Sequence, residues 1–319
     1  GVDIQPTKEF PIDPANEAGF DNSGESLSMS PALLKKYLSA ARTVVEHLVL
    51  KPDGFSFAPH PAVTDTDRDK YCVRRIIDFY ERHPTDYDQY FYAAWLFRCR
   101  TTGRDSTLTL NALAAAQGIS PKYLQKIWST LEAREEVGPI ARLQTMWNEL
   151  PSSEKGSEAA RQGCREMRWF VVDLRKKLEP KFDNLSAPGV HRGSQSFVLW
   201  KNRQYAMHRM KCNHEALLAL SKPSAEDAAR AELIIPIGAE HGRYVASFDH
   251  FCAVFPDAFY VSERGRDYLG TPKEEQEKGR LLSAGFHSMM GYFRDDTPLC
   301  QLVLNEKQNR QLDRLWHEL

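Results

Sequence analysis

The sequence lacks most of the features by which a chain reveals its function. No apolar run approaches the roughly 18 residues that a membrane-spanning helix needs, so no membrane span is predicted. The 319 residues contain no C-x-x-C pair, no C-x-x-C-H haem-attachment motif and no G-x-S-x-G nucleophile motif. The formal net charge is only −1, which excludes a global field that would draw the chain to nucleic acid or to an anionic membrane.

Cysteine and histidine are present but are not arranged as ligands or nucleophiles. The six cysteines are spread along the chain, at Cys72, Cys99, Cys164, Cys212, Cys252 and Cys300. Tight zinc sites use clustered pairs of ligands, and neither residue type shows such pairs. We therefore predict no metal, no cofactor and no catalytic residue in this chain. The cysteines are expected to be buried free thiols, with a disulfide or two only if the compartment is oxidising.

What the sequence does contain is helical periodicity. At 319 residues the chain is long enough for one large or two ordinary domains with a core, although its apolar fraction of 42% is slightly below the usual globular range. We predict a mainly α fold: a multi-helical, bundle-like body with long ordered loops and at most a minor β element. The expected helices cover residues 31–49, 67–83, 86–100, 107–117, 120–134, 138–149, 157–179, 198–220, 224–235, 242–255 and 305–319, with an apolar helix within 274–296 and a short strand at 258–263.

The stretch 151–157, PSSEKGS, is a candidate boundary between two regions. It divides the chain into an N-terminal helical region, 1–150, and a C-terminal helical region, 151–319. The irregular stretch 182–195 is a second candidate boundary. No low-complexity linker separates the halves, so packing into one body is the alternative to two domains.

Local signals define where several helices begin and end. Ser30-Pro31 and Ser120-Pro121 each place a capping hydroxyl before a proline at the first helical position. Gly118 ends the helix before the second of these pairs. Asn305 and Gln308 have the spacing of a reciprocal cap at the start of the last helix.

Residues 19–45 are the stretch around which we expect the chain to be organised. An Asp- and Gly-containing turn at 21–24 leads into the helix that begins after Ser30. That helix has an apolar face made of Leu33, Leu34, Tyr37, Leu38, Ala41, Val44, Val45 and Leu48. Phe20, Leu27 and Met29 are apolar residues in the polar segment before it, and we expect them to pack against the C-terminal half.

Aromatic and basic residues alternate in two segments and form the candidate ligand surface. A sugar or an anion would be held there by stacking on the aromatic rings and by hydrogen bonds from the guanidinium groups. The alternative is that the aromatic rings belong to the core and the arginines to structural ion pairs. The candidate residues are Trp200, Arg203, Tyr205, Tyr260, Arg264 and Arg266.

Residues 109–128 look like a helix-turn-helix, with Gly118 in the turn and Pro121–Trp128 on the helix that would enter DNA. Lys122 and Lys126 are the side chains that would reach phosphates. Acidic residues follow closely, and any two short helices joined by glycine in a packed helical protein show this pattern. DNA binding therefore remains a second alternative, and no nucleic-acid partner is predicted.

Three runs of the sequence resemble a known group of proteins. The first is GVDIQPTKEFPIDPANEAGFDNSGESLSMSPALLKKYLSAA at 1–41, and the second is GSQSFVLWKNRQYAMHR at 193–209. The third comprises FPDAFYVSERGRDYL at 255–269 and KGRLLSAGFHSMMGYFRDDTPLCQLVL at 278–304. These runs are similar to domains of unknown function in large planctomycete proteins that also carry a c-type cytochrome domain.

The resemblance implies a setting rather than a reaction. The chain would be a non-catalytic helical interaction or scaffold module of a large extracytoplasmic protein, located in the periplasm or at the cell surface, and the sequence would continue on both sides. Haem c would be bound elsewhere in that polypeptide. The module would support electron transfer with the cytochrome domain or a redox partner, or would bind polysaccharide. The alternative is an oxidoreductase or carbohydrate-active domain whose site is built from loops 51–66, 182–196 and 256–273.

Overall fold

The computed structural model describes residues 30–100, 109–135, 137–152, 156–180, 195–220, 233–260 and 294–319. Within these ranges there are twelve helices and one two-stranded sheet, so the predicted mainly α fold is confirmed. Contacts divide the chain into two compact units. The described residues of the first unit are 30–77 and 313–319, and those of the second unit lie in 78–260 and 294–312.

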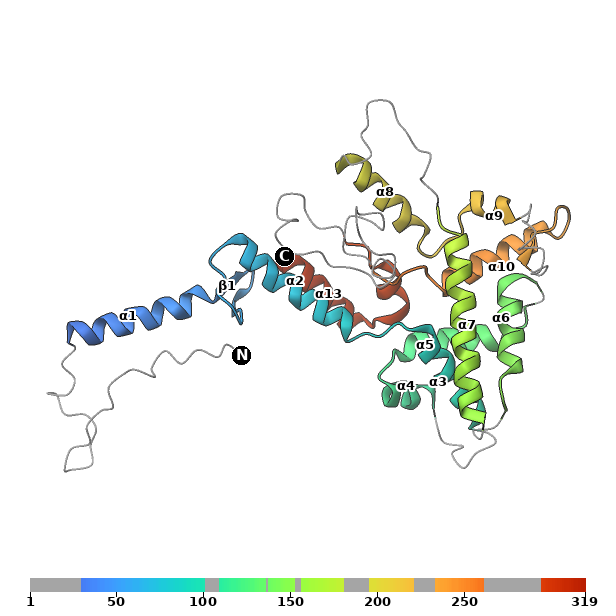
Figure 1. Ribbon diagram of the computed structural model, residues 1–319, viewed down its shortest axis with the longest axis horizontal. Helices are drawn as coiled ribbons and strands as arrows, with labels where there is room; N and C mark the ends of the chain where they lie inside the picture. Colours follow the sequence, from blue (N-terminus) through green and yellow to red (C-terminus); the bar gives the residue numbers. More distant parts are fainter. Residues whose placement is uncertain are drawn as a thin grey trace. The chain divides into compact units, whose positions relative to one another are not determined.

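The first unit begins with helix α1 (Pro31–Glu46), followed by the strands β1 (Leu48–Lys51) and β2 (Gly54–Phe57) (Figure 1). The strands pair in antiparallel register, from Leu48 opposite Phe57 to Lys51 opposite Gly54. Gly54 has a φ of 141°, which a residue with a side chain rarely adopts. The helix predicted to reach residue 49 ends at Glu46, because the next residues form strand β1. The expected loop 51–66 contains the turn and the second strand of this hairpin.

Helix α1 does not bury its apolar face against any described part of the chain, because none of its residues is buried. Leu38 and Val45 expose 62% and 64% of their surface. Phe20, Leu27 and Met29 lie outside the described residues, as does the turn at 21–24, so their packing remains a prediction.

Glu318 is the last residue of helix α13 (Glu306–Glu318). It connects the C-terminal segment of the first unit, 313–319, to the N-terminal segment 30–77. Its carboxylate accepts a hydrogen bond from Arg75 in helix α2 (Asp65–Glu81), and it lies 3.3 Å from the Lys51 ammonium. The Glu318 carbonyl oxygen accepts a hydrogen bond of 2.6 Å from Arg68. The two basic side chains thus neutralise a carboxylate that is almost fully buried.

The second unit is built around helix α5 (Pro121–Glu132), which contacts five other elements. These are α3 (Tyr87–Cys99), α4 (Leu110–Gln117), α6 (Gly138–Glu149), α10 (His241–Val254) and the π-helical turn η3 (Leu299–Val303). The long helix α7 (Ser157–Lys177) runs beside α3 and α6 (Figure 1). Large aromatic side chains fill the centre, among them Tyr90, Trp95, Tyr123, Trp147 and Phe251.

The predicted helix signals are present as hydrogen bonds. The hydroxyl oxygens of Ser30 and Ser120 accept from Leu33 N at 3.1 Å and Tyr123 N at 3.3 Å. Gly118 ends α4 in the left-handed conformation, with a φ of 65°. Asn305 and Gln308 exchange two hydrogen bonds of 2.9 Å each, which is the reciprocal cap expected at the start of α13.

The helix predicted over 198–220 is instead two helices, α8 (Gln195–His208) and α9 (His214–Leu220). The connection between them places Arg209 in the interior, where it meets two carboxylates. Asn213 then caps α9, because its side-chain oxygen accepts a hydrogen bond of 3.1 Å from Glu215 N. No glycine or proline occurs from residue 195 to residue 222, so no strong local breaker marks this break in the sequence.

Two further expectations differ from the structure or fall outside it. Residues 258–260 are not a strand, and 261–263 lie outside the described residues. Most of 224–235 and 274–296, where helices are expected, is likewise not described. The candidate boundary 151–157 falls inside the second unit, where α6 and α7 pack against each other.

Candidate functional site

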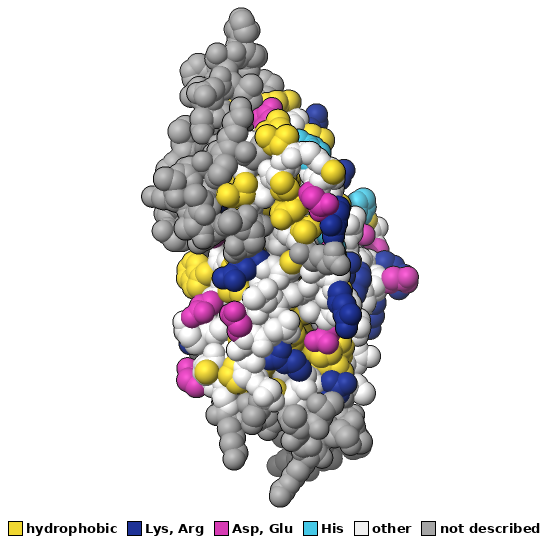
Figure 2. All heavy atoms as spheres, turned by 90° about the vertical axis from the view of Figure 1, so that its right-hand side faces the viewer, with side chains coloured by type: hydrophobic (Ala, Val, Ile, Leu, Met, Phe, Trp, Pro, Cys, Tyr) yellow, Lys and Arg dark blue, Asp and Glu magenta, His cyan; other side chains and the backbone are white. Residues whose placement is uncertain are grey.

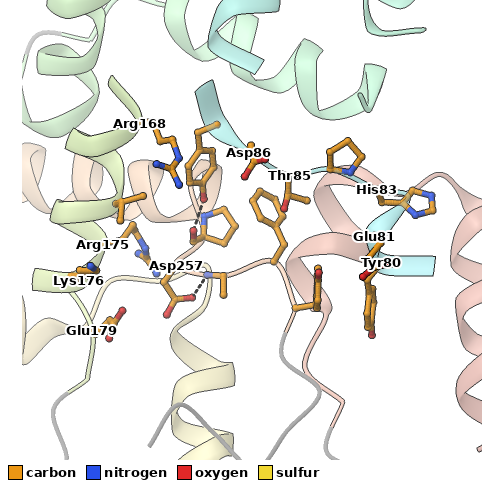
Figure 3. A pocket seen from close by; sticks show the side chains of 17 residues that line it. Tyr80, Glu81, His83, Thr85, Asp86, Arg168, Arg175, Lys176, Glu179 and Asp257 are labelled. Carbon is orange, nitrogen blue, oxygen red and sulfur yellow. Dashed lines mark hydrogen bonds between the residues drawn. The ribbon is translucent and has the colours of Figure 1, made fainter. Parts of the chain in front are cut away.

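A pocket of about 510 Å³ lies within the second unit. One wall is α7, and the opposite side is formed by the end of α2, the connection 82–86 and the start of α3 (Figure 3). The segment 256–260, which follows α10, completes the lining. A volume of this size is typical of a small-molecule site.

The helical repeat of α7 explains why one of its faces is polar and lines the pocket. Arg168, Val172, Arg175 and Lys176 recur at the spacing of one helix face, and Glu179 follows just after the helix ends. The neighbouring face carries buried side chains that include Cys164, Met167, Val171 and Leu174. The pocket wall is therefore the border of an amphipathic helix that is packed on α3 and α6.

Arg175 is the unusual group of this wall, because it exposes only 3% of its surface. Its Nη2 donates to the carbonyl oxygens of His208 and Arg209, at 3.1 Å and 3.0 Å. Its Nε and Nη1 are buried and make no hydrogen bond to any described residue. A buried guanidinium with unused donors is costly unless an acceptor reaches it, so this group favours an anion in the pocket.

The acidic group nearest the base of the pocket is already partnered. The Asp257 carboxylate accepts from Arg209 Nη1 at 3.3 Å and from Ala258 N at 2.7 Å. Arg209 Nε also donates to Asp295 at 2.6 Å. Burial raises the pKa of the Asp295 carboxyl, and the charge of Arg209 opposes that shift. The charge of Arg209 is thus balanced by two carboxylates. The backbone carbonyl oxygen of Arg209 accepts a hydrogen bond from Arg175.

Aromatic rings form the other side of the pocket. The rings of Tyr80 and Tyr260 are stacked, with centroids 4.0 Å apart and planes within 10°. The Tyr80 hydroxyl donates to Asp296 at 3.0 Å. Burial raises the pKa of Tyr260, so this phenol is neutral at physiological pH. Glu81 and Asp86 add acceptors to the same side, as Figure 3 shows.

One residue of the predicted ligand surface is among those that line the pocket. Tyr260 lines the pocket, but Trp200, Arg203 and Tyr205 of α8 are not among the lining residues. Trp200 is 39% exposed, with its ring 5.8 Å from that of Phe197, whereas Tyr205 is buried. Arg264 and Arg266 lie outside the described residues. A surface shared by all six residues therefore stays a prediction.

Arg168, Arg175 and Lys176 were not singled out from the sequence. One signal for Arg175 was available, because it falls four residues after Val171, among the apolar positions of its helix. A basic residue at a position that periodicity assigns to the core needs a hydrogen-bond acceptor inside the protein. The acceptors found here, the carbonyl oxygens of His208 and Arg209, are too remote in sequence to be predicted from the helix.

The helix-turn-helix pattern corresponds to α4 and α5, and here α5 lies in the core. Its residues Tyr123, Leu124, Ile127 and Leu131 are buried. Lys122 donates to the carbonyl oxygen of Leu304 at 3.1 Å. This packing favours a structural role for the pattern. On the face of the molecule in Figure 2, basic, acidic and apolar side chains are interspersed.

The described ranges contain neither a metal-binding cluster nor a membrane-spanning helix. No three His, Cys, Asp or Glu residues there are grouped so as to hold a metal ion. None of the helices in those ranges has the length and apolar character needed to span a membrane.

Comparison with known proteins gives one match. Residues 1–50 match the model of a family described as "Protein of unknown function (DUF1587)". No curated protein and no solved structure matches the chain. The matched residues include α1 and the first three residues of β1, so the match says nothing about the pocket.

Proposed function

We propose that the second unit is an interaction module that binds an acidic saccharide in the pocket between α7 and the segments 80–87 and 256–260. The observation that carries this proposal is Arg175. It is buried in the pocket wall, and its Nε and Nη1 have no described partner. These two nitrogens carry three of the five guanidinium donors. Because both atoms are buried, a bound carboxylate would satisfy them once the Arg175 side chain turns toward the pocket.

The rest of the lining favours a sugar acid over a more highly charged anion. Glu81, Asp86 and Glu179 would repel a phosphate, but they would accept hydrogen bonds from hydroxyl groups. Tyr260 offers an aromatic ring to the C–H face of a sugar. The Arg168 side chain already has an acidic neighbour, Asp88, at 4.0 Å. Arg175 is therefore the principal group that would donate hydrogen bonds to the carboxylate of the ligand.

Calorimetric titration with a uronic acid oligosaccharide and with its neutral counterpart tests the proposal. We expect the acidic ligand to bind at least about tenfold more tightly, equivalent to about 1.4 kcal/mol. Arg175→Met should abolish that preference. Arg165→Met is the matched control, because Arg165 lies on the same helix, is not among the pocket residues and has a 46% exposed side chain. Equal binding of both sugars, or unchanged binding by Arg175→Met, would contradict the proposal.

The wider setting is also a proposal. The match of residues 1–50 and the resemblance of the later runs support a place in a large extracytoplasmic planctomycete protein with a c-type cytochrome domain. The module would then hold a polysaccharide or a redox partner near that domain. The chain expressed with the haem-maturation machinery should show no Soret absorption, and one bound haem per chain would refute this arrangement.

A loop-built enzyme is the second candidate, since Tyr260 and His83 both line the pocket. Arg203 of the candidate ligand surface does not line it, and Arg264 lies outside the described residues. Release of reducing ends from a bound oligosaccharide, lost in His83→Gln, would establish catalysis. Unchanged oligosaccharide after prolonged incubation would favour a binding module.

A further inference from the structure

Two cysteines of the second unit face each other in its interior. Cys212 lies in the connection between α8 and α9, and Cys252 lies in α10, 40 residues later. They expose 3% and 0% of their surface. Their sulfur atoms are 3.0 Å apart, about 1 Å more than the length of a disulfide bond.

The backbone on both sides of this pair is held in place by other contacts. Arg209 lies three residues before Cys212 and pairs at 3.3 Å with Asp257, which lies three residues after the end of α10. Arg175 donates to the Arg209 carbonyl oxygen at 3.0 Å. The two cysteine segments are therefore held near each other by contacts that do not involve the sulfur atoms.

We propose that Cys212 and Cys252 form a disulfide by exchange with a small-molecule or protein disulfide. The thiolate of one of the two cysteines attacks one sulfur of the oxidant and releases its other half as a thiolate. The second cysteine then loses its proton and attacks the protein sulfur of the mixed disulfide, releasing the second half. Two protein thiols are oxidised, one disulfide is reduced to two thiols, and the protein gains one S–S bond.

In the folded unit the two thiols have different surroundings. Burial opposes ionisation of Cys252, but the hydrogen bond from Cys212 and the charge of Arg175 lower the pKa of its thiol. The pKa of Cys212 is raised, chiefly because it shares that hydrogen bond. Since both sulfur atoms are covered in the folded unit, the exchange takes place as the chain folds, when either thiol can make the first attack. The bond ties the α8–α9 connection to α10.

Refolding in a glutathione redox buffer, followed by alkylation under denaturing conditions and peptide mass spectrometry, tests this. We expect one cross-linked peptide pair containing Cys212 and Cys252, lighter than the two thiol peptides by two hydrogen atoms. Alkylation of these two cysteines should be about tenfold lower than that of Cys164, since a buried disulfide resists reduction by glutathione. This readout uses the unmodified chain, so it does not depend on a variant that folds.

Stability provides the second measurement. Reduction should lower the Tm of the oxidised protein but leave that of the double variant Cys212→Ala/Cys252→Ala unchanged. Cys164→Ala, which removes another buried thiol, should keep the full response to reduction. Complete alkylation of both cysteines after oxidative refolding, or a cross-link from either to another cysteine, would overturn the proposal. An alkylation result of either kind is independent of whether the pocket binds sugar acids.

Discussion

The two buried arginines of the second unit have opposite surroundings. Arg209 meets Asp257 and Asp295, and all three side chains expose 2% of their surface. Arg175 donates to the carbonyl oxygens of His208 and Arg209 and lies near the Cys252 thiol, whose pKa it lowers, but among the described residues its Nε and Nη1 have no hydrogen-bond acceptor. A buried charge that is fully paired stabilises or specifies a fold, whereas one with unused donors is a candidate for ligand recognition. This contrast is why the proposed function rests on Arg175.

At Glu318 we predict a loss of stability when the charge is removed. Glu318→Gln should lower the free energy of unfolding by about 1–3 kcal/mol, because Arg75 and Lys51 lose their carboxylate but still reach water. Their side chains are 28% and 17% exposed. Urea denaturation would measure the change. Glu306→Gln, on the same helix but 92% exposed, is the control and should change stability by less than about 0.5 kcal/mol.

The buried thiol of Cys164 predicts a stability that falls at alkaline pH. Burial raises the pKa of this thiol from 9.0 to about 12. Below pH 9 both folded and unfolded chains keep the proton. Between pH 9 and about 12 only the folded chain keeps it, so stability decreases by about 1.4 kcal/mol per pH unit from this group.

Urea denaturation between pH 8 and 11 would measure this effect. Cys164→Ala should show a shallower decline above pH 9, with a constant difference from the wild type at pH 7–8. Parallel curves for the two proteins would show that Cys164 does not contribute.

At the scale of elements, α6 and α10 approach closely where α6 begins. Gly138 has a φ of 76°, and a Cβ at this position would lie 2.7 Å from Ser247 Oγ in α10. Ser247 Oγ also donates to the Val137 carbonyl oxygen at 2.9 Å. The glycine is therefore required by both its backbone conformation and its neighbour.

Gly138→Ala should destabilise the protein by about 1–3 kcal/mol, or more if Ser247 cannot move. Thermal unfolding followed by circular dichroism would detect this as a lowered Tm. Gly242→Ala is the matched control, because a Cβ there meets nothing within 4 Å and Gly242 lies in the first turn of α10. A similar Tm for the two variants would refute the close approach.

Helix α5 illustrates how one pattern fits two roles. A Ser-Pro start and a preceding glycine suit a DNA-reading helix and equally suit a core helix. Ser120 caps α5 and also donates to the Val303 carbonyl oxygen at 2.6 Å. The start of the helix is thus bound to a segment more than 180 residues away, which favours the core role.

At the scale of the whole molecule, the charge balance predicts weak binding to DNA. The chain has 42 basic and 43 acidic residues, and the face in Figure 2 mixes both signs. Fluorescence anisotropy with duplex DNA should show no tight complex at physiological salt. An affinity that is high at low salt and falls steeply as salt increases would instead support the DNA-binding alternative.

The sequence by itself determined most helices and their ends. Periodicity and caps act within a few residues, so Ser30, Ser120 and the Asn305–Gln308 pair could be identified without tertiary information. The same local logic missed the hairpin, because each strand has only four residues. It also missed the break at 209–213, where the decisive partners of Arg209 are remote in sequence.

Only the tertiary structure decided the pocket and the cysteine pair. The pocket joins three segments, around residues 80–87, 168–179 and 256–260, that periodicity treats as unrelated. Tyr260 was chosen as an aromatic beside arginines, but its observed partner is Tyr80. Arg175 and Cys252 gain their chemistry from burial and from neighbours brought together by packing. Those effects depend on distances in space, which no spacing along the chain encodes.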